Sequence, residues 1–213
     1  MNVLTVTRTI ALVGLLLGLV GILARIRTIM NRPFKEDLSR PQGSARRGLL
    51  YAFTLGMAPW EKESTRKHWV SYFRGIFFHV GIFAAFGVLL VSPWLEALPE
   101  AVTLAGLILT GFGAVFGFAG IFMRLTGENE RVLSLPDDYF SVFLCSLFIA
   151  LAFTVLLLPG WLPAFYLVTA MLCVYIPYSK IRHCVYFFFS KFFFGRGFGH
   201  RAVIGQAKSK YAE

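Results

Sequence analysis

The four histidines of the chain are the residues whose type and position could support chemistry. They are His68, His79, His183 and His200. All four lie in or beside two long apolar stretches whose interiors contain almost no Asp, Glu, Lys or Arg. Ionisable side chains are rare inside membrane spans and mark function by default where they occur. The histidines are therefore the first candidates for a functional site.

His79 and His183 are predicted to reach the same depth in a membrane. His79 follows Arg74 by about one helical turn in RGIFFHVGIF, and His183 lies just past an apolar run in IPYSKIRHC. The two stretches are expected to run in opposite directions, so each histidine falls about one turn inside the same boundary, at about 1.5 Å per residue. Two imidazoles facing each other from antiparallel helices suit the iron of a b-type haem. Its propionates would need cations, and Arg74, Lys180 and Arg182 are close in sequence.

A structural role for these histidines is the alternative interpretation. Each imidazole could instead form a hydrogen bond to a neighbouring helix. Matched depth on two helices and flanking cations favour the haem over this alternative. A non-haem metal is disfavoured because no third histidine or carboxylate ligand is near the pair.

Membrane-spanning helices are the elements that must position these residues. The chain has 213 residues, of which 57% are hydrophobic and 15% charged, whereas soluble domains carry about 45–50% and about 25%. This composition excludes a soluble enzyme, a disordered chain and a small secreted scaffold. A span needs about 20 mostly apolar residues, and five stretches qualify, at residues 3–24, 75–92, 101–123, 139–158 and 161–178. We predict an all-α polytopic membrane protein, with a bundle of five transmembrane helices over residues 1–190 and a C-terminal tail over 191–213.

The distribution of Lys and Arg predicts the orientation of the bundle. Arg8 is the only basic residue before the first stretch, and the 93–100 and 159–163 connections contain none. Arg25, Arg27 and Arg32 follow the first stretch directly, which is typical of an uncleaved span rather than a signal peptide. The positive-inside rule then places the N-terminus outside and the C-terminus, with a loop over residues 25–69, in the cytoplasm. The net charge of +10 thereby reflects topology and contact with anionic lipid headgroups, not nucleic acid.

Cysteine and glycine patterns give further expectations. The three cysteines include no CxxC pair, which excludes a disulfide framework and a thiolate metal site in this chain. Gly113 and Gly117 form a GxxxG pattern, which indicates close helix packing or, alternatively, space for a flat ligand such as a haem or quinone. The aromatic segment from residue 184 to 194 is expected at the membrane interface, and the glycine-rich segment from residue 195 to 199 is expected to form a flexible turn or a docking arm.

Two motifs resemble those of the gamma-subunit family of respiratory nitrate reductases. They are FFHVGI at residues 77–82 and IPYSKIRH at residues 176–183. That family consists of five-span cytochromes b with an outside N-terminus. The resemblance implies that His79 and His183 ligate the haem nearer the cytoplasm, which passes electrons to an iron–sulfur subunit. Leu89 and Phe165 occupy the positions of the family's outer haem ligands, so the resemblance implies one inner haem b and no outer haem in the usual place. His68 and His200 are the candidates for a second haem.

The chain also looks like the shorter cytochrome b subunits of transmembrane redox complexes in sulfate-reducing bacteria. These subunits are associated with a multihaem cytochrome c outside and a heterodisulfide-reductase-like iron–sulfur protein inside. The resemblance implies a bacterial or archaeal inner-membrane subunit in a respiratory complex with other membrane subunits. It would relay electrons between a quinone pool, or a periplasmic cytochrome c, and a cytoplasmic iron–sulfur protein of the heterodisulfide-reductase or nitrate-reductase-beta type.

Interfaces and rival functions complete the expectations. The loop from Arg25 to Lys67 and the tail from Gly195 to Glu213 are expected to dock the iron–sulfur partner. A haem-free membrane anchor of such a complex is one rival function. A small transporter is another, but buried carboxylates and an internal repeat, which many transporters have, are missing from the sequence.

Overall fold

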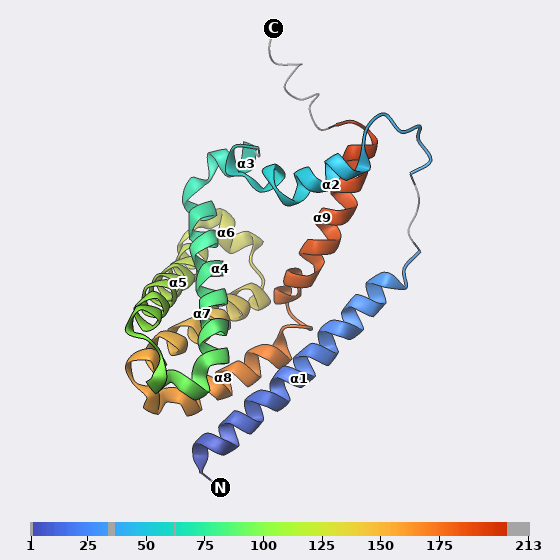
Figure 1. Cartoon of the computed structure of the whole chain (residues 1–213). Helices are drawn as coiled ribbons and strands as arrows, with labels where there is room; N and C mark the ends of the chain where they lie inside the picture. Colours follow the sequence, from blue (N-terminus) through green and yellow to red (C-terminus); the bar gives the residue numbers. More distant parts are fainter. Residues whose placement is uncertain (1, 34–36, 62, 204–213) are drawn as a thin grey trace. The chain divides into compact units, whose positions relative to one another are not determined.

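A computed structural model describes residues 2–33, 37–61 and 63–203, which form helices and connecting turns and contain no strand (Figure 1). The chain divides into two compact units. The first comprises Met1–Arg25 and Val70–Ile181, and the second comprises Ile26–Trp69 and Arg182–Glu213. Each unit is described by itself. The predicted all-α class is confirmed.

The first unit contains most of the apolar helical residues. Its long helices are α1 (Val3–Met30, which continues into the second unit), α4 (Trp69–Val91), α5 (Glu100–Thr126), α7 (Pro136–Leu157) and α8 (Leu162–Tyr175). Shorter segments connect them: η3 (Ser92–Ala97), α6 (Glu128–Leu133), η4 (Pro159–Trp161) and η5 (Lys180–Arg182). Prolines lie in the first turn of η3, α7, η4 and α8, because proline fits the first helical turn, whose N–H groups have no partner within the helix.

Four helices are long and apolar enough to cross a membrane by themselves. They are Val3–Met30, Trp69–Ala97, Glu100–Thr126 and Pro136–Leu157. The fifth predicted span corresponds to a broken pair, Pro159–Tyr175 and Lys180–His200, which passes the same test only as a pair. The described residues therefore contain four or five candidate spans, which confirms the coarser prediction of several helices that could cross a membrane, whereas the count of five and the orientation stay predictions.

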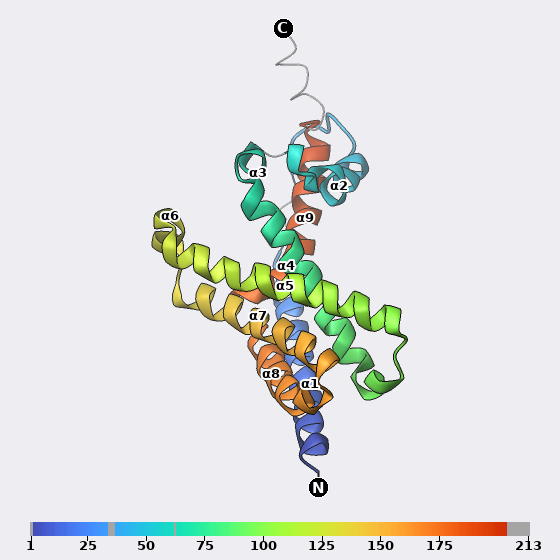
Figure 2. The ribbon, with the colours of Figure 1, turned by 90° about the vertical axis from the view of Figure 1, so that its left-hand side faces the viewer.

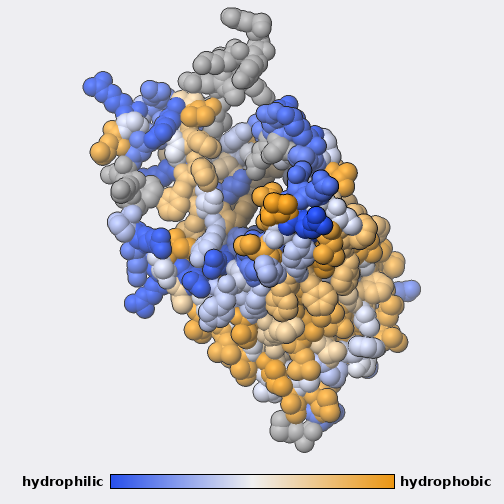
Figure 3. Space-filling model, turned by 180° about the vertical axis from the view of Figure 1, so that it is seen from behind, coloured by the Kyte–Doolittle hydropathy of each residue, from blue (hydrophilic) through white to orange (hydrophobic). Residues whose placement is uncertain are grey.

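A small aromatic core holds α7 and α8 together in the first unit. Phe148 and Phe165 are fully buried and stack with ring centroids 5.3 Å apart. The ring centroid of Phe86 on α4 lies 5.0 Å from that of Phe148. Most other large apolar side chains face outward, including Leu12 and Leu16 of α1. Figure 3 shows these hydrophobic residues in orange over much of the surface of this unit. Such a surface is stable in lipid rather than in water.

Glycines bring the helices of the first unit into backbone contact. A Cβ added to Gly81 of α4 would lie 2.5 Å from the Cα atom of Gly113 of α5, and Figure 2 shows α5 crossing α4. A Cβ on Gly117 would meet Ser146 of α7 and Phe78 of α4. The packing interpretation of the GxxxG pattern is therefore confirmed, because protein atoms fill the space beside both of its glycines.

The second unit pairs two helices through further glycines. It contains α2 (Ala45–Phe53), η1 (Leu55–Met57), η2 (Pro59–Glu61), α3 (Glu63–Lys67) and α9 (His183–His200). A Cβ on Gly195 of α9 would lie 2.8 Å from Ala52, and one on Gly199 would lie 2.9 Å from Gly48 of α2. The backbone N–H groups of Gln42 and Gly43 donate to the carbonyl of His200 and satisfy the end of α9.

The expectation of a flexible turn over residues 195–199 is therefore wrong, because α9 continues through this segment to His200. The contacts with α2 explain why a glycine-rich segment remains helical. The predicted boundary between bundle and tail, at residues 190 and 191, falls inside α9. The chain passes between the two compact units after Arg25, Trp69 and Ile181, and the predicted division into bundle and tail stays a prediction.

Candidate functional site

His79 projects from near the middle of α4 and is exposed. Its Nδ1 lies 2.6 Å from the backbone carbonyl oxygen of Gly75, one turn earlier. A carbonyl only accepts, so Nδ1 carries the proton in this contact and the lone pair of the neutral ring is on Nε2. A backbone hydrogen bond from one ring nitrogen is the arrangement that fixes the tautomer and orientation of metal-binding histidines. The imidazole thus has the tautomer that a metal ligand through Nε2 requires.

Close packing fixes the part of α4 that carries His79. The Gly81–Gly113 crossing lies two residues further along the helix. On the same helix pair, the rings of Phe77 and Phe116 stack with centroids 5.0 Å apart and an interplanar angle of 15°. The ring of Phe78 lies edge-on to the imidazole at 6.0 Å. The position of His79 is therefore set by α5 rather than by α4 alone.

His183 is the first residue of α9 and is also exposed. It follows the break between Tyr175, where α8 ends, and Lys180, where η5 begins. His183 belongs to the second unit, whereas His79 belongs to the first. The predicted pairing of the two histidines on one haem iron stays a prediction.

The three predicted propionate-binding cations differ in their surroundings. Nζ of Lys180 forms an ion pair with Asp138 at 2.6 Å, and its backbone N–H donates to Asp137. The guanidinium of Arg182 lies 5.8 Å from the ring centroid of Tyr186. Arg74 is partly buried in the first unit, and its Nε has no hydrogen-bond partner among the described residues. Of the three, Arg74 is the one whose guanidinium is left with an unused buried donor.

Arg124 is a residue that the sequence analysis did not single out. It lies in the last turn of α5, and its Nη1 donates to Ser134 at 2.9 Å. Its Nε, like that of Arg74, is buried without a hydrogen-bond partner in the described part of the chain. Gly120, one turn before Arg124 on α5, could have signalled this pair, because it leaves the space in which the Arg74 guanidinium lies.

The candidates for a second haem have other settings. His68 precedes α4, which begins at Trp69, and its backbone N–H donates to Thr65. It therefore lies outside the helix that carries His79, although a continuous helix would have placed the two residues, eleven positions apart, on one face. His200 ends α9, and its Nε2 lies 2.9 Å from the carbonyl oxygen of Ser39. Whether either residue binds a haem stays a prediction.

Two polar contacts outside the candidate spans shift pKa values in the second unit. The guanidinium of Arg201 donates to Asp37 at 2.7 Å, and together with bonds from Ser39 it holds the pKa of the Asp37 carboxyl well below its usual value of 3.8. The carboxylate of Glu61 accepts a 2.7 Å hydrogen bond from Tyr51 and raises the pKa of that phenol. Both contacts fasten segments of the predicted cytoplasmic loop.

The positions of the missing outer haem ligands are packed with protein. Phe165 is fully buried between Phe148 and Tyr166, and Leu89 packs against the same core. The hydroxyl of Ser92 lies 2.9 Å from that of Tyr166, and both residues are almost completely buried. Described side chains therefore surround both Leu89 and Phe165, the two residues that the resemblance compares with outer haem ligands.

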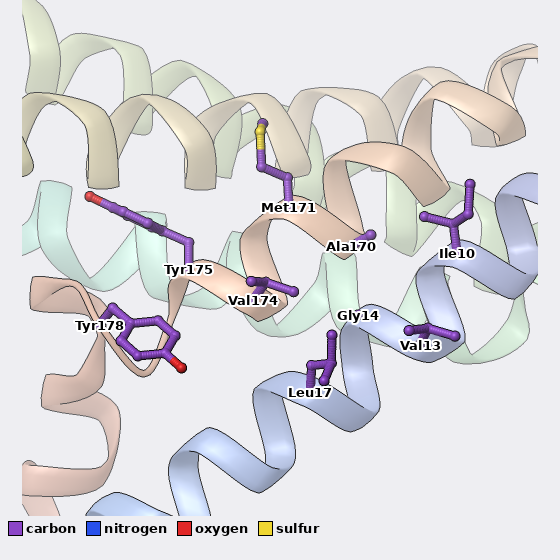
Figure 4. Close-up of a pocket in the computed structure, with 9 residues that line it drawn as sticks. All are labelled: Ile10, Val13, Gly14, Leu17, Ala170, Met171, Val174, Tyr175 and Tyr178. Atoms are coloured by element: carbon purple, nitrogen blue, oxygen red, sulfur yellow. The ribbon is translucent and has the colours of Figure 1, made fainter.

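Two hollows lie on the first unit. One, of about 500 Å³, is an almost entirely apolar groove between α1 and α8, in which Val13 and Leu17 face Ala170 and Val174 (Figure 4). The other, of about 520 Å³, lies where the start of α1 meets η3 and the start of α8, and Arg8, Trp94 and Tyr166 line it. The groove fits apolar chains, whereas the second hollow adds a cation and a hydroxyl. Sequence analysis missed the second hollow, whose lining comes from three distant segments.

Neither clusters of metal-binding side chains nor similar proteins assign a function to this site. Among the described residues, no group of three or more His, Cys, Asp or Glu side chains could hold a metal ion. A haem iron held by two imidazoles does not need such a group. No protein-family model matches the chain, and no curated protein or solved structure matches it significantly.

Proposed function

We propose that the chain is the membrane cytochrome b subunit of a respiratory redox complex. In this proposal His79 and His183 are the axial ligands of one b-type haem, which supplies a one-electron carrier when bound. Electrons pass through it between a quinone pool, or a periplasmic cytochrome c, and a cytoplasmic iron–sulfur protein. The observation that carries the proposal is the Nδ1 contact of His79 with the Gly75 carbonyl on an apolar candidate span.

The chemistry of His79 supports a haem ligand. An imidazole on an apolar helix has no obvious structural function in lipid, yet the side chain of His79 is exposed. Its tautomer places the ligating lone pair on Nε2, as iron coordination requires. A flat apolar macrocycle would cover both the imidazole and the aromatic residues that flank it on α4.

The packing of the first unit favours one haem rather than two. Phe165 and Leu89 lie where the resembling family has its outer ligands, and neither side chain can bind iron. Phe165 and Phe148 stack in the core of the unit. A second macrocycle would have to displace that core, so the proposal contains a single inner haem.

Charge supports the proposed orientation and the docking face. Every Lys and Arg except Arg8 lies on the side assigned to the cytoplasm. An iron–sulfur partner would contact the loop from Arg25 to Lys67 and the tail that follows α9. Lys35, Lys62 and Lys208, which would report this contact by crosslinking, lie outside the described residues, as does the tail after Val203.

The experiment is haem content per chain in purified membrane protein, with optical spectra of the oxidised and reduced forms. We expect about one haem in the parent, loss of the low-spin spectrum in His79→Ala and His183→Ala, and an unchanged spectrum in the matched control His68→Ala. A colourless parent would refute the proposal and favour a haem-free anchor. A parent with two haems that loses one in His68→Ala would refute the single-haem assignment.

A further inference from the structure

Two arginines in the same region of the α4–α5 pair have incomplete hydrogen bonding. Arg74 is in the second turn of α4 and Arg124 is in the last turn of α5. Among the described side chains, the Nε atoms of these two residues are the only buried nitrogens or oxygens without a hydrogen-bond partner. Most buried polar groups are hydrogen-bonded, so two adjacent exceptions need an explanation.

Packing shows that the Arg74 side chain is held in place. A Cβ added to Gly120 would collide with Nη1 of Arg74, so the guanidinium lies directly on the backbone of α5. Arg124 follows Gly120 by one helical turn on the same helix, and its charge is close enough to repel that of Arg74. The two cations are therefore brought together by the packing of α4 on α5 against their mutual repulsion.

The nearby carboxylates do not neutralise this pair. Asp137 accepts from Tyr175 and from the backbone of Lys180. Asp138 is near enough to interact with Arg124, but its Oδ2 accepts from Nζ of Lys180 at 2.6 Å and from the backbone of Leu135 at 2.8 Å. Leaving guanidinium groups partly buried without an anion is costly.

We infer that Arg74 and Arg124 together bind one oxyanion group, a carboxylate or a phosphate, that belongs to a molecule embedded in the membrane. Guanidinium groups present planar pairs of donors that match both anions. The source is either a haem propionate, in which case the inference rests on the proposed function, or the headgroup of an anionic phospholipid, in which case it does not. In both cases the anion accepts from the two buried Nε–H groups and offsets the repulsion between the arginines.

The test compares the double variant R74Q/R124Q with R131Q, which removes an exposed arginine of α6, in nanodiscs of phosphatidylglycerol and phosphatidylcholine. Native mass spectrometry after detergent exchange measures the phospholipid that each chain retains. Redox titration measures the midpoint potential of the haem. R74K/R124K, which keeps both charges, should behave more like the parent, and size-exclusion chromatography verifies that each variant is folded.

Loss of bound phosphatidylglycerol in R74Q/R124Q alone supports the inference with a lipid source. A downward shift of the haem potential in R74Q/R124Q alone, with lipid unchanged, supports it with a propionate source, because removing cations disfavours the reduced, more negative haem. If neither quantity differs from R131Q, the inference is wrong. A parent without haem that still loses lipid in R74Q/R124Q refutes the proposed function and leaves the inference standing.

Discussion

The crossing of α4 and α5 at Gly81 and Gly113 is the contact that fixes His79, and it can be tested by adding one methyl group. A Cβ on Gly81 would lie 2.5 Å from the Cα atom of Gly113. Non-bonded carbon atoms are most stable about 3.5–4.0 Å apart, so Gly81→Ala requires the two helices to separate by about 1 Å. Overpacking of this kind costs about 1–3 kcal/mol. That cost exceeds the gain of up to about 1 kcal/mol that alanine brings over glycine in a helix.

Two other glycines of α4 are matched controls. A Cβ on Gly75 or Gly87 would meet nothing within 4 Å, so Gly75→Ala and Gly87→Ala should be neutral or slightly stabilising. The assay is the midpoint of thermal unfolding of each variant in the same detergent. A loss of 1 kcal/mol in the free energy of unfolding lowers the unfolding midpoint by about 2–4 °C for a chain of this size. We therefore expect Gly81→Ala to unfold several degrees below both controls.

Two results would refute this reasoning. One is an unfolding midpoint for Gly81→Ala equal to that of Gly87→Ala, which would mean that the helices do not meet at this glycine. The other is simple additivity between Gly81→Ala and Gly113→Ala. Both methyl groups force the same separation, so the second substitution should cost less than the first.

Further predictions concern the second unit. Gly195→Ala should destabilise the pairing of α2 and α9 by about 1–3 kcal/mol. Gly197→Ala should not, because the added methyl group has open space around it. Hydrogen exchange of the α9 amides measures the difference between the two variants. The Asp37 carboxyl should titrate below its usual pKa of 3.8 by carbon NMR and return toward that value in Arg201→Gln. Because its folded pKa is depressed, the stabilisation from this ion pair is fully present above pH 3.8 and is lost as the pH falls toward the folded pKa. Loss of the pair near neutral pH would contradict this assignment.

The approximate positions of four long apolar helices followed from local sequence properties, whereas the count of five spans stays a prediction. Apolar stretches of span length and prolines at helix starts are sufficient to locate α1, α4, α5 and α7. The C-terminal part was harder because its helices depend on distant partners. Gly195 and Gly199 have the local signature of a turn, yet α2, which lies far away in the sequence, packs against them and keeps α9 helical.

The candidate site could likewise be predicted from the sequence only where it depends on local spacing. The bond between His79 and the Gly75 carbonyl follows from the spacing of four residues on a helix. The ion pair of Lys180 with Asp138 joins residues 42 positions apart, and no local pattern reveals it. Nor does a local pattern reveal that Nε of Arg74 is buried without a hydrogen-bond partner among the described residues.

The distribution of glycine, more than that of apolar residues, explains how these helices associate. In lipid, apolar side chains gain little by leaving the solvent, so helix pairs depend on close packing of their backbones. Each close helix contact described above places glycine at the point of approach. On α1, a Cβ on Gly14, Gly18 or Gly21 would come within 2.7, 2.5 or 2.5 Å of α8 or of Pro177, just beyond its end. The large side chains of α1 meanwhile point outward. Hydrophobicity thus makes these helices candidates for crossing a membrane, and the glycines select which faces meet and fix the part of α4 that carries His79.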